Sequence, residues 1–155
     1  IFKDNPAIQP DLTGHDYVLE RQLKPEPRAD IIDILKLEKV VPTAMIDVSD
    51  GLSSDLMHIC TQSGVGCRIY IEKLPIDHTT ALAAEELNLD TTICALNGGE
   101  DYELLFTVDL KDYDRLKDNP AIRVIGHVTD KGDGYNLVSH DQIIPLTAQG
   151  WKHLE

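Results

Sequence analysis

The hydrophobic positions of this chain change their period several times, and each period predicts a different element. A short helical pattern over residues 17–23 stops at Pro25, which cannot continue a helix. A second helix is expected to begin at Ala29 and to end before Pro42, because apolar residues recur at helical spacing between these positions. The apolar run that follows, residues 43–48, predicts a buried strand.

The middle of the chain alternates between helical and extended patterns. Leu52, Leu56, Ile59 and Cys60 recur on one helical face, which predicts a helix that packs on the core and ends near residue 64. The next expected elements are a strand over residues 67–71, a helix over 79–87 and a strand over 102–108. Helices and strands therefore succeed one another through this part of the sequence.

The last third of the chain predicts mainly short strands and turns. The expected elements are a short helix over 111–117 and strands over 123–128, 135–138 and 142–146. The polar, glycine-bearing segment 130–134 predicts a tight hairpin turn, so Asp130 and Asp133 are assigned to that turn rather than to a metal site. The whole pattern predicts one α/β (α+β) layered domain, with a mixed, partly antiparallel sheet flanked by helices.

Composition narrows the class of protein. The chain has 155 residues, of which 42% are hydrophobic and 26% charged, as in ordinary globular domains. Its formal net charge of -13 would repel a polyanion, so nucleic acid is not expected as a partner, and phosphate-bearing ligands would need cations to bridge them. The sequence shows neither an apolar run of about 18 residues nor a cationic leader pattern, so a membrane partner is not expected.

The cysteines indicate the compartment of this protein, and the N-terminal segment indicates its domain organisation. Cys60, Cys67 and Cys94 are odd in number and form no C-x-x-C pair, which indicates reduced thiols and a cytoplasmic protein. The chain does not begin with methionine, and residues 1–12 resemble a connector. We therefore expect a longer parent chain, in which residues 1–12 are a connector followed by a single domain over residues 13–155.

The strongest candidate for chemistry is the acidic turn after the first expected strand. Asp47 and Asp50 lie three residues apart, so their carboxylates could converge on a hard cation such as Mg²⁺. Ser49 and the backbone N–H groups after Gly51 could face a phosphate at a helix N-terminus. The alternative is that Asp50 simply caps the next helix. A calcium-binding EF-hand loop is excluded, because the spacing does not place Gly and Glu where that loop needs them.

A second acidic turn, residues 98–103, precedes another apolar strand. Two glycines permit close approach of backbone or ligand, and Glu100 supplies a carboxylate that could recognise a positive group. Asp101 and Glu103 are expected either to orient this turn or to face solvent. Asp55 and His58 lie off the apolar face of the helix expected from residue 52, and His58 is given no role.

Together, the two acidic turns resemble those of a known enzyme family. Their order and spacing, the segment Arg-Gln-Leu-Lys-Pro-Glu-Pro-Arg at residues 21–28 and the terminal Gly-Trp-Lys-His-Leu at 150–154 are similar to the C-terminal half of the thiamine-monophosphate kinases. These kinases belong to the aminoimidazole-ribonucleotide-synthetase-like (AIR-synthase-like) superfamily. Leu154 departs from the family pattern, which has Phe there.

The resemblance implies a function and a role for five residues. Asp47 and Asp50 would be Mg²⁺ ligands, Ser49 an ATP contact, and Glu100 and Trp151 substrate contacts; no further catalytic residue is assigned. The implied reaction is the ATP-dependent, Mg²⁺-assisted phosphorylation of thiamine monophosphate to thiamine diphosphate. The resemblance also implies that an N-terminal domain, missing here, precedes the connector, that the active site lies between the two domains, and that the full-length protein is a homodimer, so the isolated domain is expected to be inactive.

Two alternatives remain open at this point. The first is another ATP-dependent enzyme of the AIR-synthase-like superfamily with a different acceptor. The second is a non-catalytic binding or assembly module that keeps only the fold. Loss of Mg²⁺-dependent ATP turnover on replacing Asp47 or Asp50 would separate the enzymes from such a module.

Overall fold

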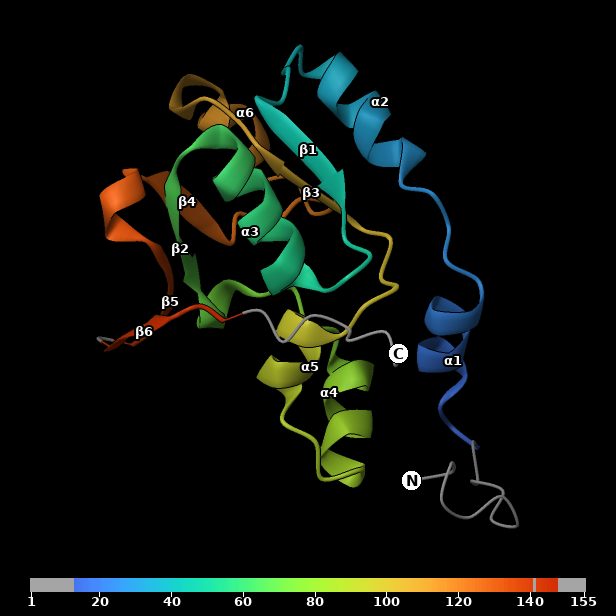
Figure 1. Cartoon of the computed structure of the whole chain (residues 1–155). Coiled ribbons are helices and arrows are strands. Elements are labelled where there is room, and N and C mark those ends of the chain that lie inside the picture. Colours follow the sequence, from blue (N-terminus) through green and yellow to red (C-terminus); the bar gives the residue numbers. More distant parts are fainter. Residues whose placement is uncertain (1–12, 141, 148–155) are drawn as a thin grey trace, which may run out of the picture.

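The computed structural model describes residues 13–140 and 142–147, so the predicted connector at residues 1–12 and Trp151 lie outside the described part. The helices are α1 (Asp16–Leu23), α2 (Ala29–Leu37), α3 (Leu52–Ser63), α4 (His78–Glu86), α5 (Thr91–Asn97) and α6 (Tyr113–Leu116). The strands are β1 (Ala44–Asp47), β2 (Gly66–Tyr70), β3 (Leu104–Thr107), β4 (Gly126–Thr129), β5 (Tyr135–Ser139) and β6 (Gln142–Pro145). Three short 3₁₀ turns cover Ile71–Lys73, Leu110–Asp112 and Lys131–Asp133. Figure 1 shows their arrangement.

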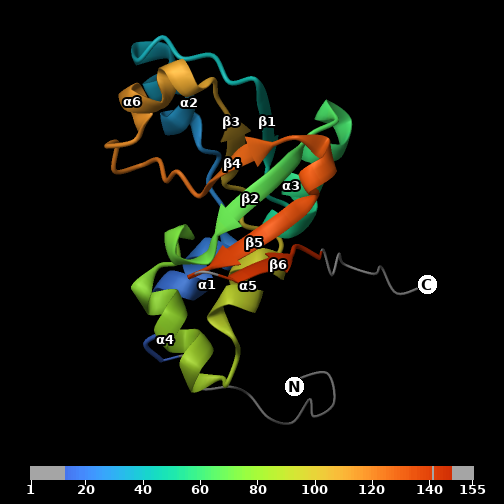
Figure 2. The ribbon, with the colours of Figure 1, turned by 90° about the vertical axis from the view of Figure 1, so that its left-hand side faces the viewer.

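The strands form two sheets. β1 and β3 pair antiparallel, with Ala44 opposite Thr107 and Asp47 opposite Leu104. The other four strands form one sheet in the order β4-β2-β5-β6, in which only β2 and β5 run parallel. Figure 2 shows this sheet with α3 behind it. The mixed, partly antiparallel α/β architecture predicted from the sequence is therefore confirmed.

Two details of the prediction are wrong. Residues 130–134 do turn the chain, but β4 and β5 do not form a hairpin, because β2 lies between them and pairs with both. Burial explains this order, since Ile69 on β2 is only 4% exposed and belongs at the centre of a sheet. Helix α5 was not predicted at all, although Asp90 caps it by accepting a hydrogen bond from the Ile93 backbone N–H.

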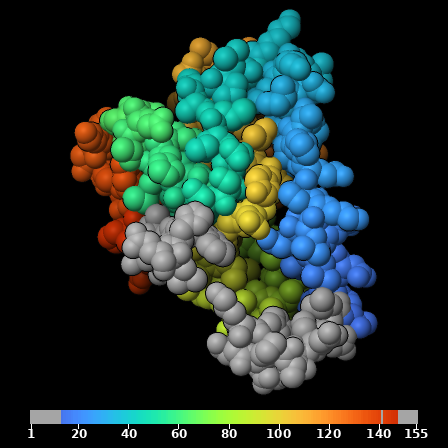
Figure 3. Space-filling view, turned by 45° about the vertical axis from the view of Figure 1, so that its right-hand side comes forward, coloured from blue at the N-terminus to red at the C-terminus, as the bar shows by residue number. Residues whose placement is uncertain are grey.

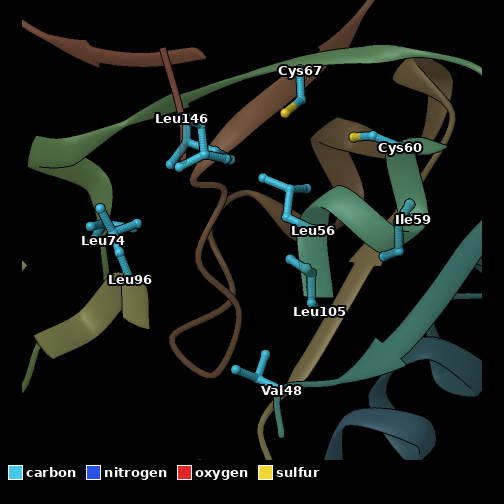
Figure 4. Close-up of a cluster of buried hydrophobic side chains, with 10 residues drawn as sticks. Val48, Leu56, Ile59, Cys60, Cys67, Leu74, Leu96, Leu105 and Leu146 are labelled. Carbon is cyan, nitrogen blue, oxygen red and sulfur yellow. The ribbon is translucent and has the colours of Figure 1, made fainter. Parts of the chain in front are cut away.

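The main hydrophobic cluster lies around α3. It includes Val48, Leu56, Ile59, Cys60 and Cys67, which Figure 4 shows gathered between the helix and the strands. The predicted apolar face of this helix is thus confirmed. Burial raises the pKa of both the Cys60 and the Cys67 thiols, the latter to about 12, so both remain uncharged thiols in the core.

The pair β1–β3 is covered by hydrophobic clusters on both faces. Alternate residues of β1, Ala44 and Ile46, pack on the α3 cluster, while Leu104 and Phe106 of β3 pack on a second cluster formed with α2 and α6. On β1 itself Met45 and Asp47 are exposed and no residue is fully buried, so the strand is present but the buried strand expected from the sequence is wrong. Among the described residues, no helix is long and apolar enough to cross a membrane.

Candidate active site

The first acidic turn links the end of β1 to the beginning of α3. Asp47 and Asp50 are exposed there, and Ser49 between them is half-buried. Gly51 is the N-cap residue of α3, and no side chain hydrogen-bonds the cap. The alternative in which Asp50 caps the helix is therefore wrong, and both carboxylates project from a turn at a helix N-terminus, where the helix dipole favours anions.

Asp55 holds this turn from inside the protein. The residue is only 2% exposed, and its Oδ2 accepts hydrogen bonds from the backbone N–H groups of Ser49 (3.0 Å) and Asp50 (3.1 Å). The periodicity of the sequence had placed Asp55 off the apolar face of the helix, so this role was missed. A carboxylate in the first turn of a helix that directly follows an acidic turn was the available signal.

Ser53 is a second buried polar residue of the same helical turn. It is 1% exposed, and its Oγ has no hydrogen-bond partner among the described residues. Its hydroxyl is free to bond a neighbouring group or a buried water, as buried polar atoms normally do.

The structure brings the two acidic turns together through backbone hydrogen bonds. Val48 donates to the carbonyl of Glu103, and the N–H groups of Tyr102 and Glu100 donate to the carbonyls of Val48 and Ser49, each at 2.8 Å. These bonds continue the β1–β3 pairing beyond its last register pair. In Figure 3 the yellow segment around residue 100 lies exposed between the teal segment with the first turn and the blue N-terminal segment.

Glycine is needed where the turns approach each other. A Cβ atom on Gly99 would lie 2.6 Å from the carbonyl oxygen of Ser49, which is closer than side chains tolerate. Gly51 has a φ of 105°, and a Cβ there would meet the backbone of Asn97 at 3.1 Å. Glu100 and Tyr102 also have positive φ angles, 65° and 51°, which non-glycine residues rarely adopt.

The second turn is held from outside by the segment after α1. Arg21 and Arg28 each form an ion pair with one carboxylate oxygen of Glu103, and Gln22 Nε2 donates to Glu100 Oε2 at 3.0 Å. Glu103 is therefore engaged by two arginines and does not simply face solvent, which fits the first of the two roles expected for it. Arg28 also hydrogen-bonds Asp30, and this contact, reinforced by the charge of Glu103, raises the pKa of Arg28.

Asp101 lies in the same turn, and the pKa of its carboxyl group is raised. The residue is exposed, yet lost hydration around its carboxyl group, together with the nearby charge of Glu103, raises its pKa to about 6, against the opposing charge of Arg21. A carboxyl group with such a pKa changes charge close to neutral pH.

The residues of the first acidic turn fit a cation that takes most of its ligands from water and substrate rather than from this chain. Within the described residues, no group of three or more His, Cys, Asp or Glu side chains is placed to hold a metal ion. Asp47 and Asp50 nevertheless supply exposed carboxylate oxygens, the ligands that Mg²⁺ takes alongside water and substrate phosphates. The two surface hollows found elsewhere, between α4 and α5 and beside Lys39 and Arg115, are lined by neither acidic turn.

Comparisons with known proteins give the family and a set of relatives. The family described as AIR synthase related protein, C-terminal domain, matches residues 9–138. The chain is 43% identical over 148 residues to the thiamine-monophosphate kinase of Escherichia coli O157:H7, covering 92% of this chain and 44% of the relative. It is 34% identical to that of Buchnera aphidicola from Acyrthosiphon pisum, covering 100% of the chain and 48% of the relative. The chain thus spans less than half the length of these relatives.

Solved structures agree with this assignment. AaThiL complexed with AMPPCP and TMP superposes with a TM-score of 0.74 at 29% identity, covering 99% of this chain and 45% of that one. The thiamine-monophosphate kinase from Stenotrophomonas maltophilia K279a follows with a TM-score of 0.68 at 30% identity, over 90% of this chain and 43% of that one. The chain therefore belongs to the family of AIR synthase related proteins, of which it carries the C-terminal domain.

Proposed function

We propose that the natural full-length protein containing this chain phosphorylates thiamine monophosphate to thiamine diphosphate with ATP and Mg²⁺. The observation that carries the proposal is the set of three backbone hydrogen bonds joining residues 48–49 to residues 100–103, because they hold a candidate metal turn beside a candidate substrate turn. The similarity to thiamine-monophosphate kinases supports the same reaction, and a structural relative binds AMPPCP and TMP.

The first turn is assigned to the nucleotide phosphates. Asp47 and Asp50 would hold Mg²⁺ there, and Ser49 would contact ATP. Phosphoryl transfer needs positioning and charge neutralisation more than covalent chemistry, and metal ions bound at the phosphates supply that neutralisation. The hydrogen bonds that the backbone N–H groups of Ser49 and Asp50 donate to Asp55 support this assignment, because they fix the peptides that carry these residues.

The second turn is assigned to the thiamine moiety. Glu100 would pair with a cationic or amino-bearing ring of the substrate, for which its exposed position is suited. Trp151, which lies outside the described residues, would stack on a flat heterocycle, a contact worth about 1 kcal/mol and more when the ring is cationic.

This chain supplies only half of the proposed site. Two exposed carboxylates leave most Mg²⁺ coordination positions to other groups, and an N-terminal domain would provide further metal and nucleotide ligands. That domain would also form the contact of a homodimer in the cytoplasm. Residues 1–155 alone are then catalytically inactive, and thiamine diphosphate formation by this chain without a partner domain would contradict the division of the site.

The test replaces each metal candidate in the full-length protein. Asp47→Asn and Asp50→Asn should each lower thiamine-diphosphate formation about 100-fold or more, the scale of loss on removing one charge-stabilising group, without unfolding the protein. Asp118→Asn, at an exposed position away from both turns, is the matched control and should keep full turnover. Unchanged turnover in the two variants would overturn the proposal and favour a non-catalytic assembly role.

The choice of acceptor needs a separate measurement. Thiamine monophosphate and aminoimidazole precursors should be offered together to the wild-type full-length protein with ATP and Mg²⁺. We expect only thiamine monophosphate to be consumed. ATP turnover with another acceptor, and none with thiamine monophosphate, would assign the protein to a different branch of the superfamily.

A further inference from the structure

Helix α1 buries little apolar surface, because its apolar residues Val18 and Leu19 are only partly buried. None of its residues is buried, and both Tyr17 and Leu23 are exposed. It packs against α4, where His15 lies 3.3 Å from Glu86. A helix with so little buried apolar surface is held weakly, so its remaining contacts decide where it lies.

Those remaining contacts converge on the second acidic turn. These contacts come from only eight residues of sequence. Arg21 and Arg28 each form an ion pair with one oxygen of the Glu103 carboxylate, and Gln22 donates a hydrogen bond to one oxygen of Glu100. The partners are 75 to 82 residues apart in the sequence. One short segment therefore engages the two acidic side chains at either end of the stretch 100–103.

The segment is itself stiff. Pro25 and Pro27 lie between the two arginines, and each restricts its own φ angle and the conformation of the residue before it. Arg28 is braced by a two-pronged contact with Asp30, at 2.9 Å from Nε to Oδ1 and 2.8 Å from Nη2 to Oδ2. Its Nη1 is thereby directed toward Glu103.

The turn that it engages needs outside support. Glu100 and Tyr102 adopt positive φ angles that only surrounding contacts can maintain in non-glycine residues. Within the described residues, Gln22 is the one side chain that hydrogen-bonds the Glu100 carboxylate, through Oε2. In the described part of the chain, no hydrogen bond engages the other oxygen, Oε1.

We propose that residues 21–28 form a clamp that positions the substrate turn, with Gln22 as a specificity-determining residue and Arg21 and Arg28 as positioning residues. The proposal rests on the function proposed above. Gln22 fixes the orientation of the Glu100 carboxylate so that its free oxygen meets a cationic or amino-bearing ring. The arginines hold Glu103 and keep the strained backbone of the turn in place.

The first test measures substrate affinity in the full-length protein. Gln22→Ala should raise KM for thiamine monophosphate about 5- to 10-fold, because a hydrogen bond to a charged group is lost, while kcat and KM for ATP stay within about twofold. Gln62→Ala, at an exposed position on α3, is the matched control and should change none of the three constants. An unchanged KM for thiamine monophosphate in Gln22→Ala would overturn the role of Gln22.

The second test does not depend on activity. In Arg28→Ala, hydrogen exchange at the Glu100 and Tyr102 amides should quicken about two- to fivefold, as expected when a partly exposed ion pair is lost, while the Ile69 amide in the centre of the sheet keeps its rate. Arg28→Lys keeps the charge without the planar fork and should restore part of the protection.

The two tests separate the clamp from the proposed function. Unchanged exchange in Arg28→Ala would refute the clamp even if the protein phosphorylates thiamine monophosphate. Faster exchange in a protein that lacks this activity would uphold the clamp and refute the function. A raised rate at Ile69 as well would mean global loosening, and would also count against a local clamp.

Discussion

The two acidic turns are joined to each other, but they are supported in opposite ways. The first turn is supported from inside, by a carboxylate of Asp55 that is 2% exposed and bonds two backbone N–H groups. The second is supported from outside, by ion pairs of Glu103 with Arg21 and Arg28, whose side chains are 39%, 40% and 22% exposed. Buried supports are strong and insensitive to salt, whereas exposed ones are weak and screened.

This difference suits the two tasks assigned to the turns in the proposed function. A turn that holds metal and phosphates benefits from fixed geometry, because transfer depends on positioning. A turn that admits and releases an organic substrate benefits from a support that can give way. The following predictions challenge this contrast, beginning with the largest expected effect.

Loss of the buried support should destabilise the whole domain. Asp55→Asn should lower the free energy of unfolding by about 2–3 kcal/mol, because the backbone N–H groups of Ser49 and Asp50, which share Oδ2, both lose a charged acceptor. Urea denaturation measures the change. Asp118→Asn, an exposed control, should stay within about 0.5 kcal/mol of wild type. An equally small effect at Asp55 would show that the first turn does not depend on inner support.

Separation of the two turns should have the next largest effect. Gly99→Ala places a Cβ atom 2.6 Å from the Ser49 carbonyl oxygen, and the strain should cost about 1–3 kcal/mol of unfolding free energy. Gly132→Ala is the control, since nothing lies within 4 Å of a Cβ there. Thermal or urea unfolding compares the two variants. Equal stabilities would mean that the turns can move apart freely.

Loss of the outer support should be milder and should depend on salt. Glu103→Gln removes the negative charge with which both arginines pair and should lower the free energy of unfolding by less than about 1 kcal/mol. The difference from wild type should shrink in about 1 M salt, where the screening length is about 3 Å. A large loss that salt does not reduce would make the two supports alike and remove the contrast.

The smallest effect is expected at Asp101, and it should depend on pH. Its pKa in the folded protein, about 6, is higher than the ordinary value of 3.8, so the folded state binds this proton more tightly than the unfolded state. The ionised carboxylate therefore destabilises the protein above about pH 6, and the penalty disappears as pH falls toward 4. Asp101→Asn should raise the melting temperature slightly at pH 8 and not at pH 4. A gain of the same size at both pH values would contradict the raised pKa.

Local patterns predicted most elements correctly. The helical period of Leu56, Ile59 and Cys60 identified the buried face of α3, and proline and glycine marked the ends of α1 and α3. The prediction of a β4–β5 hairpin was wrong. Turn residues show that the chain reverses, but they do not show that the distant strand β2 lies between the two strands. The burial of Asp55 was missed for a related reason. It comes from a turn that folds over the helix, and the spacing of apolar residues along the helix does not encode such a contact.

The candidate site was predicted in parts. The carboxylates, hydroxyl and glycines of each turn were identified from residue types and spacing, and their joint meaning came from the resemblance to a family. The sequence alone showed no contact between residues 21–28 and the second turn, because ion pairs over 75 residues or more of sequence leave no local pattern.

The sequence by itself thus determined most of the elements, α5 excepted, and the short segments proposed to carry chemistry, because helix and strand periods, turn residues and carboxylate spacing act over a few residues. Only the tertiary structure decided that Val48 and Ser49 pair with residues 100–103, that Asp55 lies beneath one turn, and that Arg21 and Arg28 hold the other. These contacts depend on how β1, β3, α1 and α3 pack, and packing is a property of the whole chain.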